Sequence, residues 1–234
     1  MESQVSSKRW IAVLAVGIAA WYLAEMLAAV PFVLVTGSAE NMVGLELGIY
    51  GALRMVLVFG GIALALRIGK ARLADIGFIR NVKADEILAG LGAGLGWGLL
   101  QLFVLIPLTG GAERSDVIAS RALIGNGTIN LLGVILLAWS MAGFGEELFY
   151  RGFLIHSIEQ VMRRPLPGKI LGVIVSLLWF AAGHAYQGWI GILDVGIAAL
   201  LFTFLYLWRG RLAAPILAHA VYDTALFIGL YFLF

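Results

Sequence analysis

The sequence predicts an all-α, polytopic transmembrane helical bundle of about seven spans, and three observations lead to this fold class. Hydrophobic residues fill 62% of the 234 positions and charged residues only 13%, whereas a soluble domain is ~25% charged. The mean hydropathy is +0.97. Apolar runs of ~20 residues, enough to cross a bilayer as a helix, recur along the chain without strand-like alternation. These observations exclude a soluble enzyme, a disordered chain and a secreted disulfide-knit domain.

Each span is predicted from one such apolar run. The seven segments are about 10–35, 43–66, 86–109, 128–156, 169–187, 189–208 and 212–234. The first follows Met1–Arg9 and is too long for a signal-peptide core, so we interpret it as a retained signal anchor. The division between the fifth and sixth spans depends on the turn-like Tyr186-Gln187-Gly188.

The distribution of Lys and Arg orients the bundle. With the N-terminus in the cytoplasm, the loops on the cytoplasmic side hold twelve basic residues and the outer loops only Arg114 and Arg121. The twelve are Lys8, Arg9, Arg67, Lys70, Arg72, Arg80, Lys83, Arg163, Arg164, Lys169, Arg209 and Arg211. Because cytoplasmic loops are enriched in basic residues, the N-terminus is expected inside and the C-terminus outside. The basic loop 67–85 is amphipathic in places and is expected to lie along the membrane interface.

Glycine residues alternate in the third span, at Gly90, Gly92, Gly94, Gly96 and Gly98. A dinucleotide-binding fingerprint needs the G-x-G-x-x-G spacing after a strand, and here both the spacing and the helical context differ. Small residues four positions apart allow two helices to approach closely. The pattern therefore favours close helix packing over nucleotide binding. Cys is absent, so disulfides, thiolate metal sites and cysteine nucleophiles are excluded.

Ionisable residues inside a membrane are costly, so each one is a candidate functional residue. They are Glu25, Arg54, Glu146, Glu147, Arg151, His184, Asp194, His219 and Asp223. Counted from the basic ends of their spans at ~1.5 Å per residue, Glu25 and Arg54 lie at matching depths of ~22 and ~20 Å. We therefore expect these two to form an interhelical ion pair.

The segment 143–153, GFGEELFYRGF, carries two adjacent carboxylates. Glu147 and Arg151 are four residues apart, so they share a helix face and can pair. Glu146 points elsewhere, rotated by about 100° on an α-helix. This predicts that Arg151 holds Glu147, whereas Glu146 remains free in low-dielectric surroundings and suits a general base. The alternative is a purely structural charge cluster.

Two of the three His residues lie at membrane depth. His184 follows Phe180 by one turn, and His219 and Asp223 share one face of the last span. A single buried His is often only a hydrogen bond between helices, but two His with several carboxylates can activate water and stabilise an oxyanion. On the same depth count, His219 is ~12 Å from its basic flank and looks shallower than Glu146 at ~25 Å.

Taken together, three motifs resemble the CPBP family, the CAAX-processing and bacteriocin-processing intramembrane proteases also called the Abi family. The motifs are Glu146-Glu147-x-x-x-Arg151, Phe180-x-x-x-His184 and His219-x-x-x-Asp223, in this order. The resemblance covers roughly 70–234. It implies a helical membrane endopeptidase with a conical, water-accessible cavity open to the cytosol. We interpret 1–234 as one membrane domain, with two spans in 1–66, a cytoplasmic loop in 67–85 and a CPBP-like core in 86–234.

The resemblance also implies roles for these residues. Glu146 and His184 would activate water, His219 and Asp223 would take the oxyanion-stabilising position, and Glu147 and Arg151 would support the site. The third motif often ends in Asn. An ionised Asp only accepts hydrogen bonds, so Asp223 is protonated, orients His219 or binds a metal.

A metal is an open alternative, because the family is often labelled as metalloproteases. Glu146, His184 and His219 would make an adequate zinc set with an open position for water. However, H-E-x-x-H is absent and the three ligands would come from separate helices. We therefore favour glutamate-dependent chemistry, with no certain cofactor and zinc or another divalent ion as the alternative.

The expected function is hydrolysis of a peptide bond in a membrane-associated protein, either a prenylated CAAX-type substrate or a leader peptide. Two alternatives remain: a non-catalytic immunity or scaffold protein on the same fold, and a small proton-coupled transporter. The expected partners are this substrate and the lipid bilayer, with no nucleic acid. The short loops favour a prokaryotic cell membrane, and the resemblance implies access from the cytoplasmic side.

Overall fold

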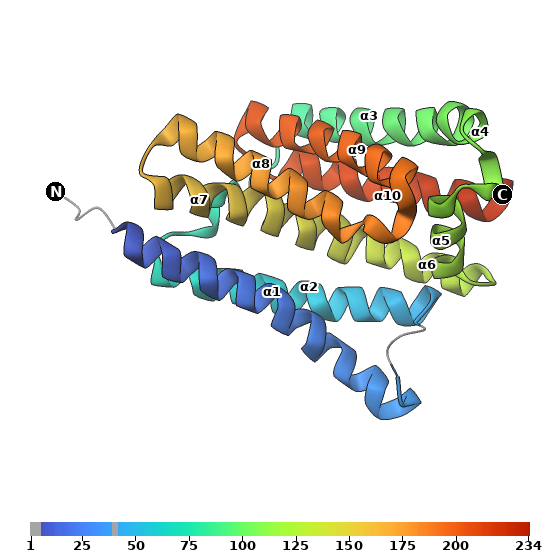
Figure 1. Cartoon of the computed structure of the whole chain (residues 1–234), viewed down its shortest axis with the longest axis horizontal. Coiled ribbons are helices and arrows are strands. Elements are labelled where there is room, and N and C mark those ends of the chain that lie inside the picture. Colours follow the sequence, from blue (N-terminus) through green and yellow to red (C-terminus); the bar gives the residue numbers. More distant parts are fainter. Residues whose placement is uncertain (1–5, 39–41) are drawn as a thin grey trace.

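The computed structural model describes residues 6–38 and 42–234, and helices dominate them (Figure 1). Seven helical stretches in this part of the chain are long and apolar enough to cross a membrane, and no strand occurs in it. The predicted all-α polytopic bundle is therefore confirmed, and the chain is a multi-pass integral membrane protein. Residues before Ser6, in the flank of the predicted signal anchor, lie outside the described residues.

The observed helices agree closely with the predicted spans. The seven stretches are α1 (Ser7–Thr36); α2 (Gly44–Ile68); α3 (Ala84–Leu100) continued by η2 (Gln101–Leu105) and α4 (Ile106–Leu108); α6 (Thr128–Leu137) continued by η4 (Ala138–Leu154) and α7 (Ile155–Met162); α8 (Pro165–Gly183); η5 (Ala185–Gln187) with α9 (Gly188–Arg209); and α10 (Ala213–Leu233). A short helix, α5 (Ser115–Ile124), lies between α4 and α6.

Several boundaries differ from the prediction. The fourth stretch continues to Met162, beyond the expected end at 156, and α8 begins at Pro165 rather than at 169. Proline suits the first turn of a helix, because the backbone N–H that it lacks would have no partner there. The division into a fifth and a sixth span is confirmed, but it falls earlier than Tyr186-Gln187-Gly188, because α8 ends at Gly183 rather than at 187. Gly188 has φ +76°, a conformation that glycine adopts readily, and there the chain turns from η5 into α9.

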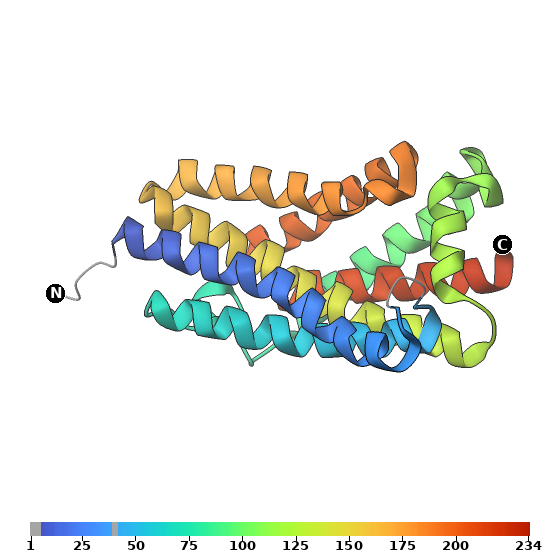
Figure 2. The ribbon, with the colours of Figure 1, turned by 60° about the horizontal axis from the view of Figure 1, so that its bottom comes forward.

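The long helices run along the long axis of the molecule, with the start of α1 at one end and the end of α10 at the other, and the short α5 stands across them (Figures 1 and 2). The turns at the N-terminal end carry the basic residues, and we call this end the basic end. Ion pairs and hydrogen bonds join its segments, including Arg209 with Asp85, Arg211 with Glu86 at 2.7 Å, and Arg9 with the carbonyl of Ile68. We call the other end, which carries α5, the α5 end.

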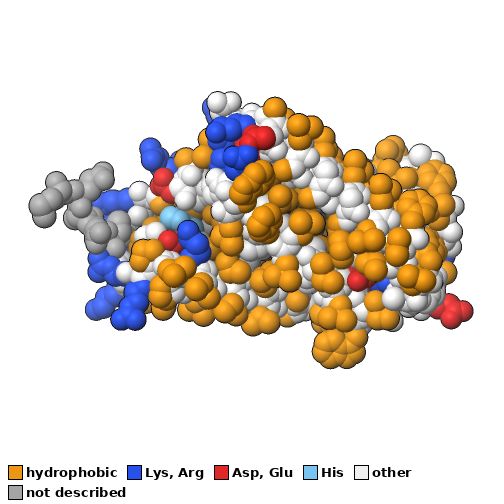
Figure 3. All heavy atoms as spheres, turned by 90° about the horizontal axis from the view of Figure 1, so that it is seen from above, with side chains coloured by type: hydrophobic (Ala, Val, Ile, Leu, Met, Phe, Trp, Pro, Cys, Tyr) orange, Lys and Arg blue, Asp and Glu red, His pale blue; other side chains and the backbone are white. Residues whose placement is uncertain are grey.

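The surface between these ends is apolar. In the face shown in Figure 3, Lys and Arg side chains gather towards the basic end, and hydrophobic side chains cover most of the rest. Large apolar side chains such as Leu34, Leu108 and Trp189 are about four-fifths exposed. Such an exposed apolar surface would be unfavourable in water and suits contact with lipid.

The glycines of α3 pack against α10. A Cβ atom on Gly94 would lie 2.5 Å from the carbonyl oxygen of Ala218, and one on Gly90 would lie 2.7 Å from that of Ala214. In contrast, a Cβ on Gly96 would meet nothing within 4 Å. Close packing through small residues four positions apart is therefore confirmed.

The loop 67–85 docks onto the basic end of the bundle. Its short 3₁₀ turn, η1 (Leu73–Ile76), buries Ile76 completely. The Leu212 N–H donates to the Gly77 carbonyl at 2.9 Å, and a Cβ on Gly152 would lie 3.0 Å from the Ile76 carbonyl oxygen. The centre of this loop is therefore packed against η4 and the start of α10, and its location at the membrane interface stays a prediction.

Candidate active site

The π-helix η4 carries the first motif, near the middle of the Thr128–Met162 stretch. Hydrogen bonds from residue i to residue i+5 widen the helix, and such segments occur frequently at functional sites. Glu147 and Arg151 are fully buried, and Arg151 Nη1 donates to Glu147 Oε1 at 2.9 Å. This pairing agrees with the sequence prediction.

Arg151 makes further contacts that hold it in place. Its Nη2 donates to the Ala199 carbonyl at 3.2 Å, and its Nε lies 3.4 Å from Thr203 Oγ1. The guanidinium also lies 4.6 Å from the ring centroid of Phe180, a favourable cation–π distance. Because a buried charge needs partners, these contacts identify Arg151 as a residue that organises the site.

His219, on α10, lies between two carboxylates. Its Nδ1 is 2.7 Å from Glu147 Oε1, and its Nε2 is 3.6 Å from Asp223 Oδ2. A carboxylate can only accept, so Nδ1–H donates to Glu147. The ring also stacks on Phe202 at 4.8 Å between centroids. Both ring nitrogens of His219 therefore face acidic side chains.

His184 ends α8 at the cavity wall. Its Nδ1 is 2.8 Å from the Phe180 carbonyl oxygen, and its ring lies 4.7 Å from the Phe180 ring. Since the carbonyl can only accept, Nδ1 carries the hydrogen, and in the neutral ring Nε2 then has a free lone pair. Phe180, in the same motif, thus orients both His184 and Arg151.

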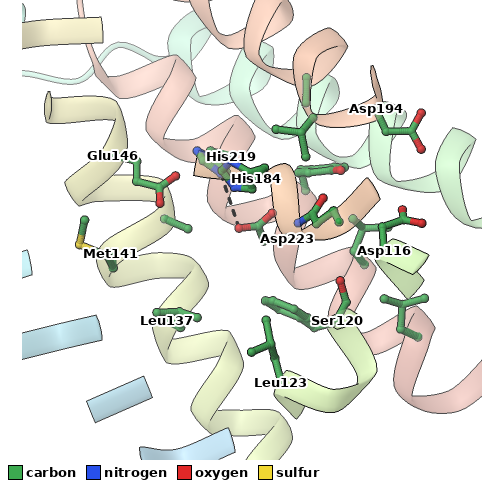
Figure 4. Close-up of a pocket in the computed structure, with 18 of the residues that line it drawn as sticks. Asp116, Ser120, Leu123, Leu137, Met141, Glu146, His184, Asp194, His219 and Asp223 are labelled. Carbon is green, nitrogen blue, oxygen red and sulfur yellow. Dashed lines mark ion pairs between the residues drawn. The ribbon is translucent and has the colours of Figure 1, made fainter. Parts of the chain in front are cut away.

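A cavity of about 330 Å³ connects these residues. Glu146, His184, His219 and Asp223 all line it, and Figure 4 shows them pointing toward one another from η4, α8 and α10. Glu146 Oε2 is buried and makes no hydrogen bond to any described residue. An unsatisfied buried carboxylate oxygen beside a cavity is well placed to hold a water molecule.

The structure brings all six predicted site residues together, but it corrects the depth of His219. His219 is only six residues after Ala213, the first residue of α10, yet it contacts Glu147 in the middle of a much longer helix. The ends of the spans that carry the basic residues are therefore not level. The depth of each residue was counted from the basic end of its own span, as if all these ends lay at one level in the membrane. For this reason His219 was expected at too shallow a depth.

Arg54 is also part of the cavity wall. The predicted ion pair is confirmed, with Arg54 Nη2 at 3.1 Å from Glu25 Oε2. The guanidinium also lies 4.7 Å from the Trp21 ring centroid. Arg54 lines the cavity together with Tyr50, which the sequence did not single out.

A second polar cluster, which was not predicted from the sequence, lies at the α5 end of the cavity. Arg114 is buried and donates to Asp116 at 2.7 and 2.9 Å, to Thr109 at 2.6 Å and to Asp194. Burial opposes the charge on Arg114, but the hydrogen bonds and charges of Asp116 and Asp194 raise the pKa of its guanidinium. Asp194 was a candidate from its depth alone. Arg114 was assigned to a loop, so its hydropathy gave no signal of burial.

Gln101 and Tyr222 form another pair that the sequence did not indicate. Both line the cavity, and the Tyr222 hydroxyl donates to Gln101 Oε1 at 3.0 Å. Neither residue carries a charge at neutral pH, so hydropathy does not mark either of them as costly within a membrane span.

The predicted zinc set does not fit this arrangement well. Nδ1 of His219 donates to Glu147 and cannot also bind a metal ion, and Nε2 faces Asp223 at 3.6 Å. No group of three His, Asp or Glu side chains in residues 6–38 and 42–234 converges as a metal-binding cluster. We therefore derive no chemical step through a metal, and the divalent-ion alternative stays a prediction.

These features define a class: a multi-pass helical membrane protein with a cluster of carboxylates and imidazoles in an internal cavity. Residues 128–225 match the family model described as Type II CAAX prenyl endopeptidase Rce1-like. The match contains all three motifs and confirms the resemblance to the CPBP family. At the level of class, it supports an intramembrane endopeptidase. Neither a curated protein nor a solved structure matches the chain.

Proposed function

We propose that this protein is an intramembrane endopeptidase of a prokaryotic cell membrane that hydrolyses a membrane-associated polypeptide with water activated by Glu146 and His184. The observation that carries the proposal is the unpaired Glu146 oxygen beside the cavity, facing two imidazoles. An unsatisfied buried polar group costs ~1–3 kcal/mol. Glu147 Oε2 is unpaired too, but only Glu146 lines the cavity, where its free oxygen can meet water.

In the proposed reaction, Glu146 takes a proton from water while the water oxygen attacks the scissile carbonyl carbon. The Nε2 lone pair of His184 orients this water, because Nδ1 is engaged by the Phe180 carbonyl. When the tetrahedral intermediate collapses, the C–N bond breaks and the leaving amine takes the proton from Glu146. This sequence returns Glu146 to its starting state, as general acid–base catalysis requires.

The developing oxyanion needs a hydrogen-bond donor, and we assign this role to His219. Two flanking carboxylates attract a positively charged ring, and that form can donate to an oxyanion. Of the three roles considered for Asp223, orientation of His219 has geometric support, since Asp223 Oδ2 lies 3.6 Å from Nε2. Glu147 and Arg151 act as positioning residues, because they touch His219 and Phe180 rather than the cavity.

The experiment compares membrane peptides from cells that express wild type, Glu146→Ala or Glu46→Ala at equal levels. Glu46 is an exposed carboxylate in the first turn of α2 and does not line the cavity, so its variant is the matched control. Quantitative mass spectrometry is expected to find new peptide termini with wild type and Glu46→Ala but not with Glu146→Ala. Identical profiles for all three inserted proteins would contradict proteolysis and favour a scaffold or a carrier.

A further inference from the structure

The cavity lies towards one end of the bundle. Its lining includes the first turns of α2, the inner face of α5, the η5 turn and the last turns of α10. Residues from these four places are Leu47, Tyr50, Asp116, Val117, Ser120, Leu123, Tyr186, Gln187, Leu226, Phe227 and Leu230. All four places belong to the α5 end (Figures 1 and 4).

The basic end contributes nothing to the described lining of the cavity. No lining residue comes from the turns 67–83, 157–169 or 207–213. Between these turns and the site lie Arg151, which is fully buried, and Gly152, which packs on Ile76. The docked loop and Leu212, which is 1% exposed, cover the site from this side.

The charges at the two ends indicate which end faces the cytoplasm. The twelve basic residues assigned to cytoplasmic loops lie in the helix ends and turns of the basic end. Ion pairs such as Arg209–Asp85 and Lys169–Glu159 join these segments. At the α5 end, Arg114 is neutralised by two Asp side chains. Under the positive-inside rule, the basic end is cytoplasmic. The expectation of a cavity that opens to the cytosol therefore conflicts with the expected orientation of the chain.

We propose that the cavity receives its substrate from the non-cytoplasmic face of the membrane. This inference rests on the proposed function, because the ligand is a polypeptide only if the protein is a peptidase. The substrate class is then a membrane-anchored protein that presents an extended segment at or beyond that face. The segment must be extended, because a helix keeps its backbone carbonyls in internal hydrogen bonds. A cytosolic prenylated C-terminus would instead meet the closed basic end.

Single-cysteine labelling tests the direction of access, and the natural absence of Cys removes any background. Three variants form a matched set: Ser120→Cys in the cavity wall, Ala112→Cys on the exposed turn at the α5 end, and Ala74→Cys on the exposed turn at the basic end. A charged, membrane-impermeant thiol reagent is applied to intact and to permeabilised cells of a bacterial host.

In intact cells, we expect Ala112→Cys and Ser120→Cys to react and Ala74→Cys to react only after permeabilisation. Reaction of Ala74→Cys in intact cells would overturn the proposal, because it would show that the basic end faces the outside of the cell. Reaction of Ser120→Cys only after permeabilisation would also overturn the proposal, because it would show that the cavity opens at the basic end. Failure of Ser120→Cys to react in either preparation would overturn it by showing that water does not reach the cavity wall.

The labelling requires no catalytic activity, so it separates the side of access from the proposed proteolysis. The peptide comparison with Glu146→Ala then gives a second readout. Termini that depend on Glu146 are expected in substrate segments at the non-cytoplasmic face. Termini in cytoplasmic segments would overturn the proposed side. If no such termini appear, the proposed proteolysis fails, and the labelling alone decides the direction in which the cavity opens.

Discussion

The Nδ1 atom of His219 lies 2.7 Å from the Oε1 atom of Glu147, across 72 residues of sequence. The same carboxylate oxygen accepts a hydrogen bond from Arg151 at 2.9 Å. One buried oxygen thus links the first and third motifs and fixes the orientation of the imidazole. The adjacent Glu146 is left without such partners and faces the cavity. Two neighbouring carboxylates therefore have different environments and different proposed roles.

Removal of the charge on Arg151 is expected to destabilise the bundle. In Arg151→Met, Glu147 keeps its negative charge in a fully buried position, and loss of one partner from a buried pair typically costs about 3–5 kcal/mol. The double variant Glu147→Gln, Arg151→Met should recover much of this loss, because no unpaired charge remains. Thermal unfolding in detergent measures both effects. Wild-type stability of Arg151→Met would contradict the organising role of this residue.

Substitution of His184 by Gln is expected to reduce proteolysis by about 10²-fold or more, the usual contribution of a general base or its partner. The fold should persist, because His184 lies at the end of α8 and is not fully buried. The control is His156→Gln, which removes the remaining histidine. His156 packs against Trp10 and does not line the cavity, so this variant should cleave at close to the wild-type rate. Equal rates for the two variants would refute the role of His184.

The two glycines Gly94 and Gly96 should respond in opposite ways to alanine. A Cβ on Gly94 would lie 2.5 Å from the Ala218 carbonyl oxygen, so Gly94→Ala must separate α3 from α10 and lower the thermal stability. Gly96→Ala enters open space and should be neutral or stabilising by up to about 1 kcal/mol, because alanine favours the helix. Equal unfolding temperatures would show that α3 does not pack through the Gly94 face.

Proteolysis is expected to survive removal of divalent metal. Both nitrogens of His219 face carboxylates, and the proposed reaction uses Glu146 as its base without a metal step. The measurement combines elemental analysis of the purified protein with activity before and after treatment with a strong chelator. One bound zinc per chain, with loss of activity on chelation and recovery on addition of zinc, would support the alternative set of Glu146, His184 and His219.

The spans and the candidate site residues were predictable because both depend on local features of the sequence. Seven apolar runs predicted seven helices, and most of the predicted boundaries are within a few residues of the observed ones. Charged residues in such runs are costly wherever they occur, so Glu146, His184, His219 and Asp223 could be selected without a structure. The Glu147–Arg151 pair followed from their spacing on one helix.

The tertiary structure decided what depends on the relative position of different helices. His219 appeared too shallow because the sequence does not show how far α10 is displaced along the bundle axis, and Arg114 appeared to be a loop residue until Asp116 and Asp194 enclosed it. The location of the cavity towards the α5 end has the same origin. Hydropathy reports whether about 20 consecutive residues prefer lipid to water, whereas the axial shift and rotation of each helix are set by contacts such as Gly94 against Ala218. Those contacts join residues far apart in the chain, and no single segment encodes them.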